Sequence, residues 1–180
     1  MADKVDTTLR SRMGFTGRAF AVRVDDVRLP NGRESVREVV VHKGSVCIVP
    51  TDGETVYFVR QYRHATGETL LELPAGGLNP GEEPEACARR EIQEEIGLAA
   101  RDMTLLFEGY VSPGYTSELM RFFLAENLSP SVADADDDEF IDVVSMSWPD
   151  AVAAAERGEF RDNKTVAGLF AAARRLKRLS

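Results

Sequence analysis

The chain has 180 residues, 43% hydrophobic and 29% charged, a length and composition that suit one sizeable hydrophobic core rather than two. Its formal net charge of −8 argues against broad nucleic-acid binding, because contacts to phosphates require a basic surface. No apolar run is long enough to cross a bilayer and the first residues lack the apolar centre of a signal peptide, so we expect a cytoplasmic protein without a membrane partner.

Two pairs of strands are predicted in the first third of the chain. Residues 20–24 and 38–41 favour strands, and the Asn31-Gly32 pair between them supplies the positive φ angles of a tight hairpin turn. The strands predicted at 45–49 and 55–61 are joined through Asp52-Gly53 by the same turn chemistry. We therefore expect two consecutive hairpins.

A helix is predicted to begin near Pro84 and to end just before Gly97. Proline suits the first helical turn and glycine suits the position past the end. Ala88, Ile92 and Ile96 recur every four residues, which gives the helix an apolar stripe that docks on the core.

The remaining predicted elements are mostly strands. Strands are expected at 70–72, 103–110, 118–125 and 140–146, and helices at 149–156 and 164–179. Strands joined mostly by hairpins and interleaved with a few helices indicate an α+β fold, arranged as an α/β/α sandwich of mixed sheet.

The predicted helix carries three carboxylates close together. At about 100° per residue, Glu91, Glu94 and Glu95 fall within one arc beside the apolar stripe. Like charges at this spacing repel, and hard oxygen-seeking cations such as Mg²⁺ or Mn²⁺ would compensate them. Arg90 could pair with one carboxylate and fix its rotamer, and Glu82 could anchor the loop before the helix. Spacing alone fits a solvated acidic face equally well.

The segment around this helix resembles the Nudix box at every defining position. The shared pattern is Gly76, five residues, Glu82, seven residues, and then Arg90-Glu91-Ile92-x-Glu94-Glu95-x-Gly97-Leu98. The resemblance implies a loop-helix-loop on a sandwich, divalent metal binding, and hydrolysis of a nucleoside diphosphate linked to another group. It also implies roles by position: Glu91 and Glu95 as principal metal ligands, Glu94 as a further ligand or water positioner, the Ala75 carbonyl as a backbone ligand, and Glu82 as a structural or outer-sphere contributor.

A second stretch resembles the ADP-ribose pyrophosphatase subfamily. Pro113 lies 15 residues after Leu98 in a loop over residues 110–118, and residues 37–42, 59–63 and 71–76 are similar to the same subfamily. A Pro-Gly pair between strands is also an ordinary turn, and Arg37 suits an ordinary surface strand equally well. The resemblance implies that Arg63 holds a phosphate and that Arg37 and Glu38 reach the substrate across a homodimer interface.

The acidic run at residues 134–139 has two interpretations. Such a block is usually a solvated loop. The family resemblance places a catalytic glutamate before a strand like 140–144, which implies Glu139 as the general base and Asp138 as the alternative.

Together these patterns predict residues 1–43 as an N-terminal β-hairpin extension that forms a homodimer, and residues 44–180 as a Nudix hydrolase domain. The expected reaction is Mg²⁺-dependent hydrolysis of ADP-ribose to AMP and ribose 5-phosphate. The alternatives are another nucleoside diphosphate sugar, GDP- or UDP-linked, or a nucleotide-sensing module without turnover. The expected site comprises catalytic Glu139, Glu94 and Arg90; metal-binding Ala75, Glu91, Glu94 and Glu95; and substrate-binding Arg37, Glu38, Arg63, Glu82, Ser112, Pro113, Gly114 and Glu118.

Overall fold

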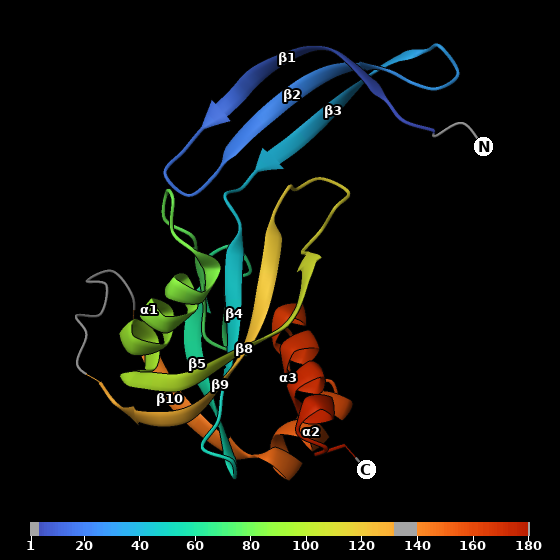
Figure 1. Ribbon diagram of the computed structural model, residues 1–180. Helices are drawn as coiled ribbons and strands as arrows, with labels where there is room; N and C mark the ends of the chain where they lie inside the picture. Colours follow the sequence, from blue (N-terminus) through green and yellow to red (C-terminus); the bar gives the residue numbers. More distant parts are fainter. Residues whose placement is uncertain (1–3, 132–139, 180) are drawn as a thin grey trace. The chain divides into compact units, whose positions relative to one another are not determined.

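The computed structural model describes residues 4–131 and 140–179 (Figure 1). The chain divides into two compact units, one formed by Met1–Gly44 and Tyr110–Leu119, the other by Ser45–Gly109 and Met120–Ser180. None of the described helices is long and apolar enough to cross a membrane.

The first unit contains an antiparallel sheet in the order β1-β2-β3. Its strands are β1 (Thr7–Thr16), β2 (Ala21–Arg28) and β3 (Glu34–Val41). The turn between β2 and β3 contains Gly32 with φ of 83°, and its N–H donates to the Leu29 carbonyl over 2.9 Å. The first predicted hairpin is therefore confirmed, whereas β1 was not predicted from the sequence.

The second unit contains two sheets. One has the order β7-β4-β9-β8, with β4 parallel to β9 and antiparallel to β7. The other is antiparallel in the order β10-β5-β6. The strands are β4 (Ser45–Pro50), β5 (Thr55–Arg63), β6 (Glu68–Glu72), β7 (Ala75–Gly77), β8 (Leu98–Tyr110), β9 (Leu119–Pro130) and β10 (Ile141–Ser147).

The second predicted hairpin is wrong, because β4 and β5 belong to different sheets. The chain does turn at Asp52-Gly53, where the Asp52 carboxylate accepts from the Thr55 N–H over 2.8 Å, and a bridge joins Thr51 to Val56. Beyond this bridge the two strands take other neighbours. All six residues of β4 are buried, as in a central strand paired on both edges. The turn residues predicted where the chain reverses, but they did not predict which strands pair with β4 and β5.

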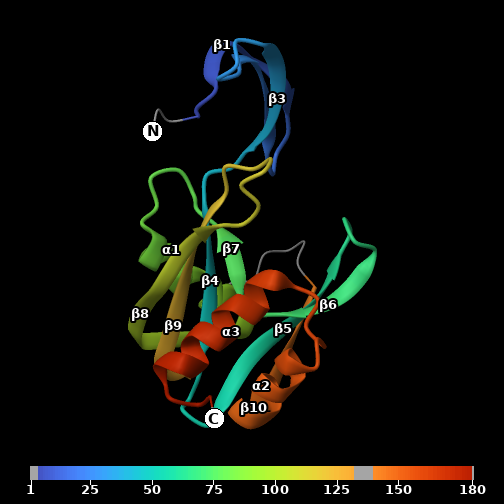
Figure 2. The same ribbon diagram turned by 90° about the vertical axis from the view of Figure 1, so that its right-hand side faces the viewer.

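The described residues form three helices: α1 (Pro84–Ile96), α2 (Trp148–Glu156) and α3 (Asn163–Arg175). Helices α1 and α3 pack on β4, whereas α2 packs against α3, β5 and β10. Figures 1 and 2 show α1 on one side of β4 and α3 on the other. Val46 and Ile48 pack in a core with the apolar stripe of α1, whereas Cys47 and Val49 pack in a second core with α2 and α3. This alternation follows the two-residue period of a strand. The predicted α+β sandwich and its three helices are confirmed.

Candidate active site

Local sequence signals position the carboxylate helix α1. Pro84 is its first residue, and Gly97 takes the left-handed conformation at φ 66° and donates to carbonyls of the last turn. The stripe of Ala88, Ile92 and Ile96 is buried, as expected. The same packing carries neighbouring Glu91 and Glu95 inward, and each is only 8% exposed.

The buried carboxylates of α1 meet the backbone of β7. The Ala75 N–H donates to Glu95 Oε2 over 3.0 Å. A Cβ atom placed on Gly76 would lie 1.9 Å from Glu91 Oε1, so this carboxylate occupies the space that any other side chain would need. Gly76 is therefore required for close approach, and the Ala75-Gly76 backbone and two carboxylates converge at one place.

Arg90 organises the carboxylates on the outer side of the helix. Its Nε lies 2.9 Å from Glu82 Oε1, and its Nη1 lies 2.7 Å from Glu94 Oε2 and 2.7 Å from Glu91 Oε1. We expected a pair with one carboxylate, and the structure has pairs with three. The hydrogen bond from Arg90 lowers the pKa of Glu82 to about 2.

Glu82 also anchors the loop before α1, as predicted. Its Oε2 accepts from the Asn79 N–H over 2.8 Å, so the same carboxylate ties this loop to Arg90 on the helix. The loop and the helix are thus joined through one carboxylate.

The oxygen donors of this cluster suit a hard divalent cation by their chemistry. The fit rests on the Glu91 and Glu95 carboxylates that converge on the backbone of Ala75 and Gly76. Glu94 is instead turned toward Arg90. Within the described ranges, no three His, Cys, Asp or Glu side chains are already arranged to hold a metal ion. Arg90 supplies positive charge to the cluster in this structure.

Arg63, expected to hold a phosphate, is oriented by a carboxylate that sequence reasoning missed. Its Nε and Nη2 donate to the two oxygens of Glu72 over 2.9 Å and 2.7 Å. Lys164 Nζ also donates to Glu72 Oε2. Burial acts to raise the pKa of Glu72, but the hydrogen bond from Arg63 and the charge of Lys164 outweigh it and lower the pKa. A glutamate within the apolar run Leu70-Leu71-Glu72-Leu73 was the available signal, since a buried carboxylate requires a cation.

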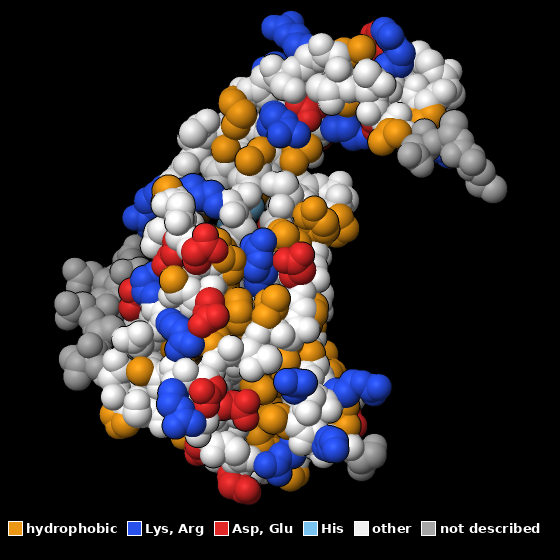
Figure 3. Space-filling model, viewed as in Figure 1, with side chains coloured by type: hydrophobic (Ala, Val, Ile, Leu, Met, Phe, Trp, Pro, Cys, Tyr) orange, Lys and Arg blue, Asp and Glu red, His pale blue; other side chains and the backbone are white. Residues whose placement is uncertain are grey.

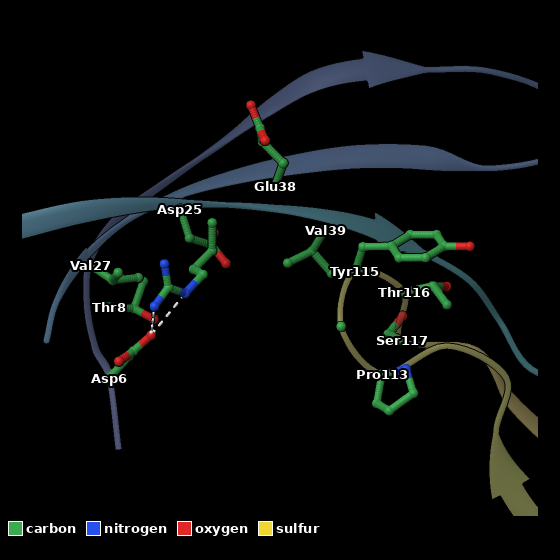
Figure 4. Close-up of a pocket in the computed structure, with 12 residues that line it drawn as sticks. Asp6, Thr8, Asp25, Val27, Glu38, Val39, Pro113, Tyr115, Thr116 and Ser117 are labelled. Carbon is green, nitrogen blue, oxygen red and sulfur yellow. Dashed lines mark hydrogen bonds and ion pairs between the residues drawn. The ribbon is translucent and has the colours of Figure 1, made fainter. Parts of the chain in front are cut away.

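Four of the expected substrate-binding residues line a cavity of about 390 Å³ in the first unit: Arg37, Glu38, Pro113 and Gly114. Arg37 Nε donates to Asp6 Oδ2 over 2.9 Å at one end of this cavity. The Glu38 side chain points away from Asp6 and Pro113, toward the other face of β3 (Figure 4). Neighbouring Arg37 and Glu38 therefore offer their side chains to different faces of the sheet.

The other two residues expected in this loop flank the cavity. The Ser112 carbonyl accepts from the N–H groups of Tyr115 and Thr116 over 3.2 Å and 3.0 Å, which closes the loop as a turn. Glu118 Oε1 lies 4.0 Å from His42 Nδ1. The expected general base Glu139 and its alternative Asp138 lie outside the described residues.

Comparison with known proteins gives a consistent picture. The model of the NUDIX domain matches residues 41–169, and that of the nucleoside diphosphate sugar hydrolase N-terminal domain matches residues 7–40. The chain is 39% identical over 163 residues to an ADP-ribose pyrophosphatase of Bacillus subtilis, covering 89% of this chain and 88% of the relative. It is 38% identical over 131 residues to a GDP-mannose pyrophosphatase of Citrobacter koseri, covering 68% of each.

A solved structure described as an ADP compounds hydrolase has a TM-score of 0.87 and 28% sequence identity, covering 96% of this chain and 95% of that one. The carboxylate helix, the fold and the matched domain all agree with the resemblance at residues 76–98. The chain belongs to the Nudix family and is a Nudix pyrophosphohydrolase.

Proposed function

We propose that this protein hydrolyses the diphosphate bond of ADP-ribose to give AMP and ribose 5-phosphate. The observation that carries the proposal is the convergence of the buried Glu91 and Glu95 carboxylates on the backbone of Ala75 and Gly76. Buried carboxylates at a glycine-lined position suit the recognition of a cation together with a phosphoanhydride. The choice of ADP-ribose is supported by the Bacillus subtilis relative, whose similarity extends over most of both chains.

Four residues would hold the divalent cation, for which we propose Mg²⁺ with Mn²⁺ as a substitute: Ala75 through its carbonyl, and Glu91, Glu94 and Glu95 through their carboxylates. When bound, the cation would neutralise charge on the diphosphate oxygens and make a bound water more acidic.

The remaining residues would orient groups around the reacting diphosphate. Arg90 pairs with Glu91, Glu94 and Glu82 and so connects the three carboxylates. We propose that the Arg63 guanidinium binds a substrate phosphate, and that Glu139 deprotonates the attacking water, with Asp138 as the alternative. Catalysis of this kind depends mainly on positioning and on complementary charge.

We further propose that the protein is a cytoplasmic homodimer that binds neither nucleic acid nor membrane. The first unit exposes Leu9, Met13, Phe15 and Val36 on its strands and Phe20 just before β2. Figure 3 shows hydrophobic side chains on the surface of this unit. Exposed apolar groups in this number favour an interface with a second copy. In such a dimer, Arg37 and Glu38 would reach the partner's substrate, with Ser112, Pro113, Gly114 and Glu118 completing the loop of each site.

A panel of substrates tests the proposed reaction. The purified protein is incubated with Mg²⁺ and ADP-ribose, GDP-mannose or UDP-glucose, and the products are identified by mass. We expect AMP and ribose 5-phosphate, with ADP-ribose giving the highest kcat/KM. Faster hydrolysis of GDP-mannose would favour the alternative that the Citrobacter koseri relative supports. Binding of ADP-ribose without turnover of any compound would favour a sensing module.

A further inference from the structure

A buried network of charged groups connects the start of α3 to Arg63. The Glu72 side chain is only 2% exposed, and its Oε2 accepts from both Arg63 Nη2 and Lys164 Nζ. Lys164 Nζ also donates to Asp162 Oδ2 over 2.8 Å, and the Lys164 side chain is 15% exposed. Two cations and two carboxylates therefore balance one another in a largely buried place.

The same helix end holds the backbone that leads into the carboxylate site. Asp162 caps α3 by accepting from the Thr165 N–H over 3.1 Å and from the Thr165 hydroxyl over 2.6 Å. The Thr165 hydroxyl oxygen accepts in turn from the Leu73 N–H over 2.8 Å. Leu73 directly follows Glu72 and lies two residues before Ala75. The network thus contacts both Arg63 and the chain segment that carries Ala75.

Arg63 has an edge left for a ligand. The two hydrogen bonds to Glu72 use Nε and Nη2, so Nη1 lies on the edge of the planar guanidinium that faces away from Glu72. The Arg63 side chain is 37% exposed, so its charged group is partly open to solvent. Its interaction with an anion depends on how much of its charge Glu72 neutralises.

We propose that Lys164 is a positioning residue for substrate binding, which shares the Glu72 carboxylate and so keeps the Arg63 guanidinium both oriented and attractive to a substrate phosphate. This inference rests on the proposed function, because it takes Arg63 as the phosphate-binding group. Without Lys164, Arg63 would be the remaining cation of the network against the two carboxylates of Glu72 and Asp162, and an approaching diphosphate would meet net negative charge. Charges a few ångströms apart in a partly buried place are weakly screened, so this change is felt at the ligand.

A charge series at this network tests the proposal. Lys164→Met removes the cation at similar length, and we expect KM for ADP-ribose to rise roughly three- to tenfold with kcat within about twofold, because the lost attraction acts on the bound ground state and the transition state alike. Asp162→Asn keeps the helix cap and removes one negative charge, so KM should fall below that of the wild type. Lys164→Arg keeps the positive charge, so its KM should stay close to the wild-type value.

A matched control separates this effect from general loss of positive charge. Arg161→Met removes a neighbouring cation, whose ion pair with Glu68 is exposed. We expect this variant to change KM by less than about twofold. Melting temperature is measured for every variant, because a purely structural role predicts lower melting temperatures for Lys164→Met and Asp162→Asn with no opposite changes in KM.

The proposal is refuted if Lys164→Met and Asp162→Asn both raise KM, or if Lys164→Met leaves KM unchanged. Should Lys164→Met not fold, the KM of Asp162→Asn decides. Isothermal titration calorimetry of ADP-ribose binding in the presence of EDTA, which prevents turnover, should give the same order of affinities among the variants. If the wild-type protein neither binds nor hydrolyses ADP-ribose, the proposed function is refuted. If the wild type is active but KM does not rise from Asp162→Asn through the wild type to Lys164→Met, only the role of Lys164 is refuted.

Discussion

The two charged clusters of the second unit differ in how their charges are balanced. On the α1 side, Arg90 pairs with Glu82, Glu91 and Glu94, and the buried Glu95 lies one turn after Glu91. On the α3 side, two cations, Arg63 and Lys164, pair with two carboxylates, Glu72 and Asp162. Among these residues, the first cluster has four carboxylates and one guanidinium, whereas the second has two carboxylates and two cations; the charge of Glu95 also acts on Arg63. An excess of buried carboxylates calls for an added cation, whereas a neutral network is complete within the protein.

Of the substitutions considered, Glu95→Gln should reduce activity most, because it removes one carboxylate charge from the cluster on the α1 side. Glutamine has nearly the same shape and can still accept from the Ala75 N–H, but it removes a charge that a divalent cation needs. We expect kcat to fall by at least about a hundredfold while the circular dichroism spectrum stays unchanged. Near-normal turnover at saturating Mg²⁺ would refute the assignment of Glu95 as a metal ligand.

Gly76→Ala should damage the same cluster sterically. The new Cβ would lie 1.9 Å from Glu91 Oε1, so either the carboxylate or β7 has to move. We expect kcat/KM to fall by at least about tenfold and the free energy of unfolding to fall by roughly 1–3 kcal/mol. Gly77→Ala is the matched control, because a Cβ there has no atom within 4 Å. Equal losses for the two variants, measured by kinetics and urea unfolding, would contradict the steric account.

How far the sequence predicts these clusters depends on whether their signals are local. Pro84, Gly97 and the apolar stripe lie within one short segment, and they placed α1 and its carboxylates correctly. The α3-side network was missed because Lys164 and Glu72 are separated by 92 residues, so only the folded chain brings them together.

The strands show the same limit. The β2–β3 hairpin was predicted because its turn and both strands are contiguous in sequence. The partner of β4 could not be read from its turn, since its parallel neighbour β9 lies far along the chain. β1 was missed although Leu9, Met13 and Phe15 stand at alternate positions, with Arg10 and Arg12 between them, a two-residue period typical of a strand.

Added Mg²⁺ should distinguish the two clusters even without substrate, because we propose that only the carboxylates on the α1 side bind it. A ligand that binds only the folded state stabilises it by about 1.4 kcal/mol at ten times its dissociation constant, which raises the melting temperature of a chain of this size by roughly 3–6 °C. We expect this rise in the wild type and in Lys164→Met, and its loss in a Glu91→Gln, Glu95→Gln double variant. An equal rise in the double variant would show that Mg²⁺ binds elsewhere.

The smallest expected effect is the response of the balanced cluster to acid. The pKa of Glu72 in the folded protein lies below its ordinary value of 4.5, because its hydrogen bonds and cations outweigh its burial. A carboxylate with a lowered folded pKa contributes stability above its unfolded pKa, and that contribution is lost as the pH falls through the folded pKa. Urea unfolding of the wild type and Glu72→Gln at pH 7 and at points below pH 4.5 should therefore show a stability gap that narrows toward low pH. A gap that stays constant across this range would mean that the Glu72 charge contributes no net stability, and that the network acts through shape alone.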